Sequence, residues 1–544
     1  MKYPKAKKGC YQTCHQRIIA EGLPSLIQVE YCEGPHGQRS SWLHCGDLHS
    51  SYIDPRYHLT PKDKSTMTDP KSVAIIGAGI FGLSLAIALR DRNYEVIVFD
   101  RSQYDANGYD PTAEDVQAAS ADHNKIFRAS YGKEIHYQRL ALESRRAWVL
   151  EDEQRGLTEQ DDSGNIRLFV NSGMLRIQPS DHLAALEKET LANMQRDGLR
   201  DTQFITSDLA DCERADKLGW KDKLLNFHIP DSAESIYEAV LDSLAGFVRC
   251  SNACAHYRRL AAEKGVKFCF GPKGSVDHLV KVKSNLELGK DQVTGLKTKD
   301  GIIHDADVVV VAAGSFSTQI LPELSYHLES SAGSLATFKI DKRNTELWNK
   351  YSPERFPVMT WKSTPRDIYG NDTGSIYVLP RTPEGLVKIG YRGIKWTNFQ
   401  PAPQDTPFTQ DGQWSVPLPV NECSLLPEPA LHAIKQFVSV FLPEFKDTPF
   451  FSTKLCWYTD SLDNSFVIDY VPTYAEKSVF VCTGGSGHGA KFLPVLGKHA
   501  ADIFENGDQS TSFMRPFWHW RPDTPRRNGL EEGPGGPRDI SHNK

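Results

Sequence analysis

Short apolar runs alternate with helical apolar spacing near the start of the longest patterned region. Residues 73–76 form an apolar run, apolar positions recur with helical spacing over 83–89, and the stretch 95–99 contains a second apolar run after Glu95. Apolar runs of about four to eight residues predict buried strands, and the helical spacing predicts a packed helix. The pattern therefore predicts consecutive strand, helix and strand, as in an α/β unit with a parallel sheet.

The same alternation returns further along the chain. Residues 306–317 contain an apolar strand that ends in a glycine–serine turn, 478–482 form another strand, and 490–504 have helical spacing. Strands that are apolar along their whole length are typical of a sheet covered on both faces, so we expect them to join the first sheet. Residues 320–455 instead alternate strand patterns with proline-rich loops, which predicts a mostly antiparallel second domain.

A chain of 544 residues is too long for one compact core, so at least two domains are expected. The predicted nucleotide-binding domain is discontinuous, with segments 69–170, 231–317 and 456–510. The predicted β-rich substrate domain comprises 171–230 and 318–455. Two further predictions concern the ends: a disordered extension over 1–68, which lacks sustained periodicity, and a mobile Pro-, Gly- and Arg-rich tail over 520–544.

Three glycines follow the first predicted strand directly. Gly77 permits a tight turn, Gly79 lets backbone N–H groups approach a pyrophosphate, and Gly82 lets helix and strand pack closely. The helix N-terminus presents its positive dipole end to the phosphates. Asp100, at the end of the second strand, is suited to accept hydrogen bonds from ribose hydroxyls. This unit predicts a bound dinucleotide, with NAD and FAD both open.

Composition and charge restrict the binding partners, the compartment and the metal sites that we expect. The net charge of −6 gives no basic field, so we expect no nucleic acid partner, and no apolar run approaches the ~18 residues of a membrane span. The eleven scattered cysteines suit a reducing compartment, and the chain does not end in Ser-Lys-Leu, so the cytosol is the default and the peroxisome stays open. We also expect a monomer. Zinc at Cys10, Cys14, Cys32 and Cys45 with His15 does not match the usual finger spacings, so no metal is predicted.

A second glycine loop, at residues 484–489, also joins a predicted strand to a helix. Such a helix N-terminus concentrates N–H donors and positive potential. Near a flavin pyrimidine carbonyl it would stabilise the anionic reduced ring. This loop therefore favours FAD over NAD.

Six motifs resemble one family. They are GAGIFG at 77–82, NKIFRASYG at 124–132, ADVVVVAAGSFS at 306–317, GLVKIGYRG at 385–393, CWYTDSLDNSFVIDYVP at 456–472 and GGSGHGAKFLPVLG at 484–497. Over about residues 70–510 the chain resembles the monomeric sarcosine oxidase branch of the FAD-dependent amine oxidases, which includes fungal pipecolate, saccharopine and fructosyl-amino-acid oxidases. The stretches GYRGIKWTN and CWYTDSLDN are most similar to the pipecolate/saccharopine members. The resemblance implies an α/β fold: a Rossmann-like FAD-binding domain of the glutathione-reductase type and an α+β, β-rich substrate domain.

The resemblance also implies roles for individual residues. Cys456 matches the cysteine that carries FAD covalently, and Lys388 matches the lysine that assists O₂ reduction, where a cation stabilises superoxide. Arg128 and Lys491 match the pair that binds the substrate carboxylate. The remaining assignments are Lys125 and His488 beside the flavin, and for cofactor binding Gly77, Gly79, Ile80, Phe81, Gly82, Asp100, Arg101, Gly314, Gly485, Gly487 and Gly489.

One position departs from the bacterial members. They usually carry His directly after the Gly-Tyr that follows the active lysine, whereas this chain has Arg392. Arg392, with Lys395 nearby, is suited to receive a second acidic group or a larger polar substrate, which argues against sarcosine itself.

The function implied is a flavin oxidase that oxidises a secondary α-amino acid, of the pipecolate, saccharopine or sarcosine type, at its C–N bond to an imine and reduces O₂ to H₂O₂. The alternatives are a fructosyl-amino-acid oxidase, a dehydrogenase with a protein or quinone acceptor, and a non-catalytic flavin-binding protein. Each of these residues also has a non-catalytic interpretation. Lys125 and Arg128 could form a solvated basic edge, and Lys388 could be an exposed strand lysine. Cys456 could be a buried structural thiol, and His488 could hydrogen-bond to the loop backbone.

Overall fold

A computed structural model describes residues 70–113, 116–156, 166–229, 235–361, 376–404, 412–522 and 524–542. The predicted extension over 1–68, with the cysteines considered for zinc, lies outside the described residues. From Thr68 onward the chain forms one compact unit. Two large sheets, of six and eight strands, organise the described part of this unit.

The first large sheet has six strands in the order β21-β22-β13-β1-β2-β9. All neighbours are parallel except β21, which runs antiparallel to β22. The strands are β1 (Ser72–Ile76), β2 (Glu95–Asp100), β9 (Lys267–Phe270), β13 (Val308–Val311), β21 (Val467–Tyr470) and β22 (Val479–Thr483). Central strands β1, β13 and β22 are almost fully buried, as their continuous apolar runs predict.

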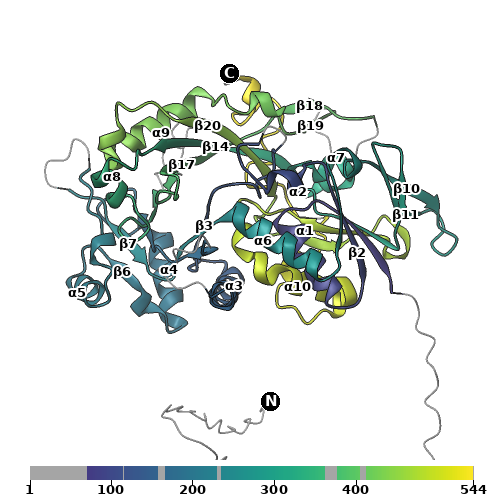
Figure 1. The fold of residues 1–544 in the computed structure, drawn as a ribbon, viewed down its shortest axis with the longest axis horizontal. Coiled ribbons are helices and arrows are strands. Elements are labelled where there is room, and N and C mark those ends of the chain that lie inside the picture. Colours follow the sequence, from purple (N-terminus) through teal and green to yellow (C-terminus); the bar gives the residue numbers. More distant parts are fainter. Residues whose placement is uncertain are drawn as a thin grey trace, which may run out of the picture. The chain divides into compact units, whose positions relative to one another are not determined.

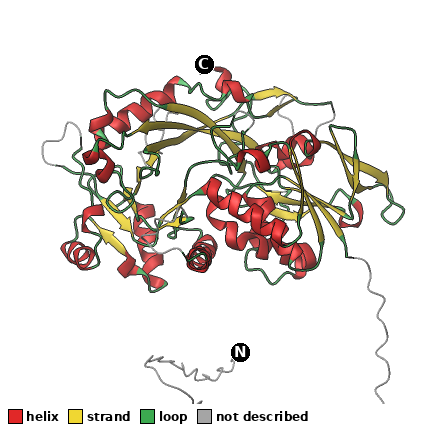
Figure 2. Ribbon diagram, viewed as in Figure 1, coloured by secondary structure: helices red, strands yellow, loops and turns green. Residues whose placement is uncertain are grey.

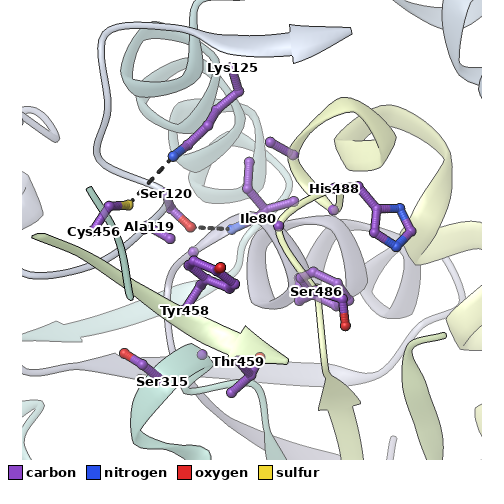
Figure 3. Close-up of a pocket in the computed structure, with 18 of the residues that line it drawn as sticks. Ile80, Ala119, Ser120, Lys125, Ser315, Cys456, Tyr458, Thr459, Ser486 and His488 are labelled. Atoms are coloured by element: carbon purple, nitrogen blue, oxygen red, sulfur yellow. Dashed lines mark hydrogen bonds between the residues drawn. The ribbon is translucent and has the colours of Figure 1, made fainter. Parts of the chain in front are cut away.

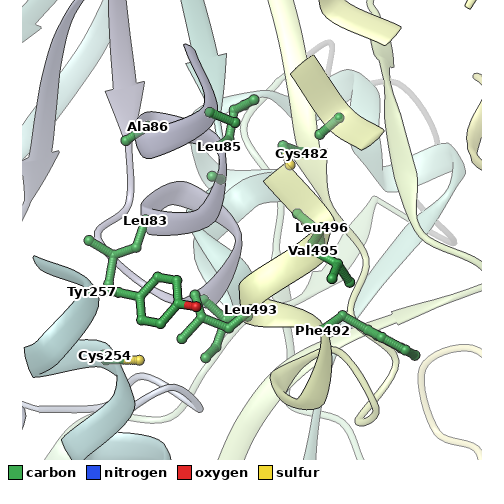
Figure 4. Packing of buried hydrophobic residues seen from close by; sticks show 14 of the residues in the cluster. Leu83, Leu85, Ala86, Cys254, Tyr257, Cys482, Phe492, Leu493, Val495 and Leu496 are labelled. Carbon is green, nitrogen blue, oxygen red and sulfur yellow. The ribbon is translucent and has the colours of Figure 1, made fainter. Parts of the chain in front are cut away.

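Helices cover this sheet. Those labelled in Figure 1 beside it are α1 (Ile80–Arg90), α6 (Cys250–Glu263) and α10 (Leu493–Asn506), and α3 (Ile135–Gln154) packs against α10. Leu83 and Leu85 of α1 and Leu493 and Leu496 of α10 lie in one fully buried cluster (Figure 4). The predicted strand–glycine turn–helix–strand unit is therefore present, as β1, α1 and β2.

The second large sheet has eight strands in the order β20-β14-β17-β16-β15-β5-β7-β6. All its pairs are antiparallel except β15 with β5, in agreement with the predicted mostly antiparallel domain. The strands are β5 (Met174–Ile177), β6 (Gln203–Ile205), β7 (Ala239–Asp242), β14 (Leu328–Lys339), β15 (Val358–Trp361), β16 (Ile376–Val378), β17 (Leu386–Trp396) and β20 (Ser452–Ser461). Helix α9 (Glu428–Phe441) packs on it with Phe437 and Phe441, above the long strands in Figure 2.

Smaller elements complete the unit. Three further sheets contain β10 (Val276–Lys283), β11 (Asp291–Thr298) and β12 (Ile303–Asp305); β3 (Lys125–Phe127), β8 (Gly246–Val248) and β4 (Phe169–Val170); and β18 (Phe399–Pro401) with β19 (Gln413–Ser415). The remaining α-helices are α2 (Tyr104–Asn107), α4 (Ala185–Arg196), α5 (Leu209–Lys217), α7 (Ser317–Ile320), α8 (Thr345–Lys350) and α11 (Arg515–Trp518).

Two predicted domain limits differ from the observed sheets. Strand β7 falls inside a segment predicted for the nucleotide-binding domain, and β20 crosses the predicted limit between residues 455 and 456, yet β7 pairs with β5 and β20 pairs with β14 in the eight-stranded sheet. An apolar strand has the same sequence pattern in either sheet, so only the pairing decides its membership.

The segment beyond residue 520 is not the mobile tail that its composition predicts. Leu530 and Ile540 are buried, and the buried Arg538 forms an ion pair with Glu329 of β14 at 2.6 Å. A parallel bridge between Thr397 and Asp539 attaches the segment near β17, and Figure 1 shows the C-terminus beside β18. Composition missed this because the anchoring residues are few and widely spaced.

Helices α1 and α10 approach closely at Gly497. A Cβ added there would lie 1.9 Å from the carbonyl oxygen of Ser84, and the Ser84 hydroxyl accepts a hydrogen bond from the Gly497 N–H at 2.7 Å. The same hydroxyl donates to the carbonyl of Leu493 at 2.6 Å. The close packing of α1 against α10, which supports the first glycine loop, therefore requires that residue 497 has no side chain.

We predict that Gly497→Ala lowers the free energy of unfolding by about 1–3 kcal/mol, because the added methyl group must separate two packed helices. Urea unfolding followed by circular dichroism measures this. Lys498→Ala, at the exposed next position, is the matched control and should change stability by less than about 0.5 kcal/mol. Equal stability of the two variants would contradict the close approach.

Candidate active site

One large cavity, of about 1280 Å³, lies between the two large sheets. One side is formed at the carboxyl ends of β1, β2 and β13, where ligands of open α/β sheets bind. The other side is formed by residues of β5, β14, β16, β17 and β20. A nucleotide-binding sheet edge and a second domain thus face the same space.

The first glycine loop has the geometry that its sequence predicts. Gly77 has φ +113°, and a Cβ there would lie 2.4 Å from the carbonyl oxygen of Ala312. The Ile80 N–H at the start of α1 donates to the Ser120 hydroxyl at 3.1 Å, drawn in Figure 3. Asp100 accepts from the backbone N–H groups of Ala78 and Ser102 at 2.8 and 2.9 Å. These two hydrogen bonds fix the carboxylate at the cavity wall.

Other predicted cofactor residues surround this loop. Arg101 lies 3.8 Å from the centre of the Phe316 ring, and Gly314 has φ +54° at the end of β13. Phe81 lies against the second glycine loop, where a Cβ on Gly489 would be 2.6 Å from its ring. The two glycine loops are therefore neighbours, although about 400 residues separate them in sequence.

Cys456 and two lysines form the first charged group of the cavity. Lys125 Nζ lies 3.7 Å from Cys456 Sγ, as Figure 3 shows, and 2.7 Å from Asp122 Oδ2. Lys388 Nζ lies 2.7 Å from Asp122 Oδ1 and donates to the carbonyl of Asn124. Lys388 is 2% exposed, so it is not an ordinary surface lysine, and Asp122 bridges both ammonium groups.

The charges explain the direction of each pKa shift. Burial alone would raise the pKa of Asp122, but the positive charges of Lys125 and Lys388 hold it well below its usual value. Burial favours the neutral form of Lys125, yet Asp122 raises the Lys125 pKa above normal. For Lys388 burial prevails, and its pKa is lowered despite Asp122. The sequence reasoning overlooked Asp122; its position three residues before Lys125 was the available signal.

Arg128 and Lys491 form a second group around one tyrosine. Lys491 Nζ donates to the Tyr131 hydroxyl at 2.7 Å, and the Arg128 guanidinium lies 4.2 Å from the centre of the Tyr131 ring. Within the described part of the chain, neither cation forms an ion pair with a carboxylate. Burial, and then the charge of Arg128, lower the pKa of Lys491 well below normal. Two basic side chains thus share a cavity wall without a carboxylate partner among the described residues.

Arg392 belongs to a third group, on strands β17 and β20, which flank β14 in the eight-stranded sheet. Its Nε donates to the Tyr458 hydroxyl at 3.2 Å, and its Nη2 lies 3.8 Å from Asp460 Oδ1. Lys395 is closer to the same oxygen, at 3.2 Å. A Cβ on Gly487 would lie 2.0 Å from Arg392 Nη1, so only a glycine lets the guanidinium lie against the second loop.

His488 of the second glycine loop lies among these cations. Its Nε2 is 2.9 Å from the carbonyl oxygen of Asn464, whereas Nδ1 is buried without a hydrogen-bond partner. Burial and the positive charges of Lys491, Arg128 and Arg392 lower its pKa well below 6.5. Neutral His488 therefore donates from Nε2 to the Asn464 carbonyl, which lies outside the second glycine loop, and presents Nδ1 as an acceptor.

Nearly all the predicted site residues line this one cavity. The exceptions are Gly82, whose Cβ would be 1.8 Å from the Gly77 carbonyl oxygen, and Lys388, which lies behind Asp122 and Asn124. Asn124, which sequence reasoning did not assign, lines the cavity with both side-chain polar atoms buried and without a partner. In the described part of the chain, no helix is long and apolar enough to cross a membrane.

Residues 72–503 match the model of a family described as DAO, FAD dependent oxidoreductase. The chain belongs to this family, and the protein is an FAD-dependent oxidoreductase. It is 27% identical over 457 residues to an L-saccharopine oxidase of Schizosaccharomyces pombe, a match that covers 83% of this chain and 94% of that protein. It is also 27% identical over 399 residues to an N-methyl-L-tryptophan oxidase of Salmonella enteritidis, covering 72% and 86%.

Solved structures agree on the fold. A modified fructosyl peptide oxidase from Aspergillus nidulans is similar with a TM-score of 0.67 and 21% identity, covering 88% of this chain and 99% of that one. The fructosamine oxidase Amadoriase II of Aspergillus fumigatus has a TM-score of 0.65 and 23% identity, covering 88% and 97%. The expected family and α/β fold class are confirmed.

FAD fits the cavity. The glycines of the first loop leave room for a close backbone approach, Asp100 stands where the ribose acid of a dinucleotide site is needed, and the volume exceeds that of an ordinary small-molecule pocket. The second glycine loop, next to the first, adds further N–H donors to the cavity lining.

Asp122 offers a test of the buried charges. We predict that Asp122→Asn lowers the free energy of unfolding by about 3–5 kcal/mol at neutral pH, because it leaves two buried lysines without their shared carboxylate. Since the folded-state pKa of Asp122 is depressed, the difference should be constant above about pH 5 and shrink below about pH 4.

Urea unfolding at several pH values measures this difference. Asp216→Asn is the matched control, since Asp216 pairs with Lys221 at the surface and its loss should cost less than about 1 kcal/mol. A loss at Asp122 as small as the control's would contradict the bridging role.

Proposed function

We propose that the protein oxidises the C–N bond of a secondary α-amino acid, of the pipecolate or saccharopine type, with reduction of O₂ to H₂O₂. The observation that carries the proposal is the pair Arg128 and Lys491. Both cations face the cavity, and neither has a carboxylate partner among the described residues. A substrate carboxylate would supply the missing charge, and a guanidinium binds both carboxylate oxygens at once.

Tyr131 supports the orientation of this pair. Its hydroxyl accepts from Lys491, and its ring carries the Arg128 guanidinium. The backbone carbonyl of Lys491 accepts from Trp148 Nε1 at 2.7 Å, which fixes the lysine's main chain. A carboxylate held here is oriented before any chemistry, and this orientation lowers the entropic part of the barrier.

Bound FAD would supply two-electron redox chemistry: the C–H bond beside the amine nitrogen would be broken, the N–H proton lost and the C–N bond converted to an imine, and the electron pair would pass on to O₂ to give H₂O₂. The protein's part is to bind, orient and supply charge. Neutral His488 offers Nδ1 as a hydrogen-bond acceptor beside the proposed carboxylate clamp. Lys388 and Lys125 hold fixed positive charge near Cys456, where charge that develops on reduced oxygen would be stabilised. This charge supports an oxidase over a dehydrogenase.

Arg392 extends the proposal to the rest of the substrate. Its guanidinium faces the cavity, and its nearest carboxylate is taken more closely by Lys395. We expect this arginine to bind a second acidic group, as a dicarboxylic or tricarboxylic secondary amine would provide. The name of the S. pombe relative, a saccharopine oxidase, agrees with this class.

The substrate test uses the purified yellow protein without oxygen. Pipecolate, saccharopine, sarcosine and fructosyl-valine are added in turn while the visible flavin absorbance is followed. Bleaching by pipecolate or saccharopine, with H₂O₂ release in air, supports the proposal. Bleaching by fructosyl-valine alone would favour an oxidase of glycated amino acids, and bleaching without H₂O₂ would favour a dehydrogenase.

For the preferred substrate, we predict that Arg128→Met raises KM on the order of a hundredfold, equivalent to about 2–3 kcal/mol of lost carboxylate binding. Steady-state H₂O₂ production measures KM. Arg146→Met, on the exposed face of α3, is the control and should leave KM unchanged. An unchanged KM in Arg128→Met would contradict the proposal that Arg128 and Lys491 bind the substrate carboxylate.

We further propose that Cys456 carries the flavin as a thioether. The thiol is free, half-buried and on the cavity wall. We predict that acid-denatured wild-type protein stays yellow, whereas Cys456→Ala releases its flavin into the supernatant. Cys212→Ala, at another free thiol outside the cavity, should behave as wild type. Flavin released by the wild type would refute the covalent link and leave the oxidase proposal standing.

A further inference from the structure

The C-terminal segment, defined as residues 520–542, lies beyond the family match at 72–503 yet reaches the cavity. It is anchored at both ends. Arg521 pairs with Asp463 at 2.9 Å and donates to the Phe466 carbonyl, and Arg538 pairs with Glu329. These anchors hold the chain between them against the rim of the cavity.

Asn528 is the residue of this segment that lines the cavity. It has φ +66°, a left-handed conformation that asparagine and glycine tolerate. Its Oδ1 accepts from Lys395 Nζ at 2.6 Å, and its Nδ2 donates to the Ser461 carbonyl and to Asn464 Oδ1, both at 2.9 Å. All the polar atoms of the amide side chain are used, so its orientation is fixed.

Lys395 is held by two partners, Asn528 and Asp460. Asp460 is fully buried, and its Oδ2 accepts from Ser331. Its Oδ1 is shared, with Lys395 at 3.2 Å and Arg392 at 3.8 Å. Two cations therefore compete for one carboxylate oxygen, and the nearer one is the lysine that Asn528 holds.

This competition determines how closely Arg392 is paired within the protein, and therefore how available its guanidinium is to an anion in the cavity. If Lys395 moves away from Asp460, Arg392 can close the gap and pair with the carboxylate. An arginine with a close internal partner binds an external anion less well, because the new ion pair must replace an existing one. The position of Lys395 thus controls the anion affinity of Arg392.

We propose that the C-terminal segment is part of the substrate site and that Asn528 is a positioning residue: it keeps Lys395 on Asp460 and leaves Arg392 available for a second carboxylate of the ligand. The amino-acid nature of the ligand rests on the proposed function. The preference for a dicarboxylate can be measured by binding alone, without turnover. The positioning role of Asn528 and the proposed function can therefore be refuted separately.

The test measures binding of two simple acids to the flavin-loaded protein through the change in flavin absorbance. Glutarate has two carboxylates, and valerate, of the same chain length, has one. Wild type should bind glutarate more tightly than valerate. Asn528→Gly, which keeps the left-handed backbone, should weaken glutarate binding about fivefold to tenfold and change valerate binding less than about twofold.

Two further variants separate positioning from a general structural effect. Arg392→Ala should lose at least as much glutarate affinity, and Asn528→Gly added to it should cause no further loss, because Asn528 acts through Arg392. Lys395→Met should reproduce the selective loss if Asn528→Gly folds poorly. Asn93→Gly, at an exposed position with φ +67°, is the matched control and should bind both acids as wild type does.

Several results would overturn the inference: no glutarate preference in the wild type, equal weakening of both acids, no effect of Asn528→Gly, or additive losses in the double variant. Failure of every secondary amino acid to bleach the flavin would remove the proposed function alone. A selective glutarate loss in Asn528→Gly would still support the positioning role.

Discussion

The main constraint on this site is that it buries more basic side chains than carboxylates that could pair with them. Asp122 serves both Lys125 and Lys388, and Asp460 serves both Lys395 and Arg392. Tyr131 contacts Lys491 and Arg128 without neutralising either. Burying unpaired cations is costly, so the surrounding fold must be stable enough to hold them.

That stability comes from two sheets with different tasks. The parallel six-stranded sheet ends its strands at the cavity and positions both glycine loops through the tight contact of α1 with α10. The mostly antiparallel eight-stranded sheet supplies β17, which contains Lys388 and Arg392, and β20, which contains Cys456 and Asp460. Backbone loops suit an extended anionic cofactor, and a rigid sheet suits charges whose spacing must not change.

The C-terminal segment extends this division of tasks. It is anchored to β14 through Arg538 and Glu329 and reaches the rim of the cavity at Asn528. A segment outside the family match thus contacts the part of the cavity where Arg392 departs from the bacterial pattern.

The sequence by itself determined the β1–α1–β2 unit, both glycine loops and the class of fold, because strand runs, helical spacing and glycine turns are local patterns. Through family motifs it also indicated Lys125, Arg128, Cys456 and Lys491, all of which line one cavity. Only the tertiary structure revealed the bridging by Asp122, the burial of Lys388, the sheet membership of β7 and β20, and the packed C-terminal segment. These depend on contacts between residues far apart in the chain, where strand pairing and charge compensation act and local patterns carry no information.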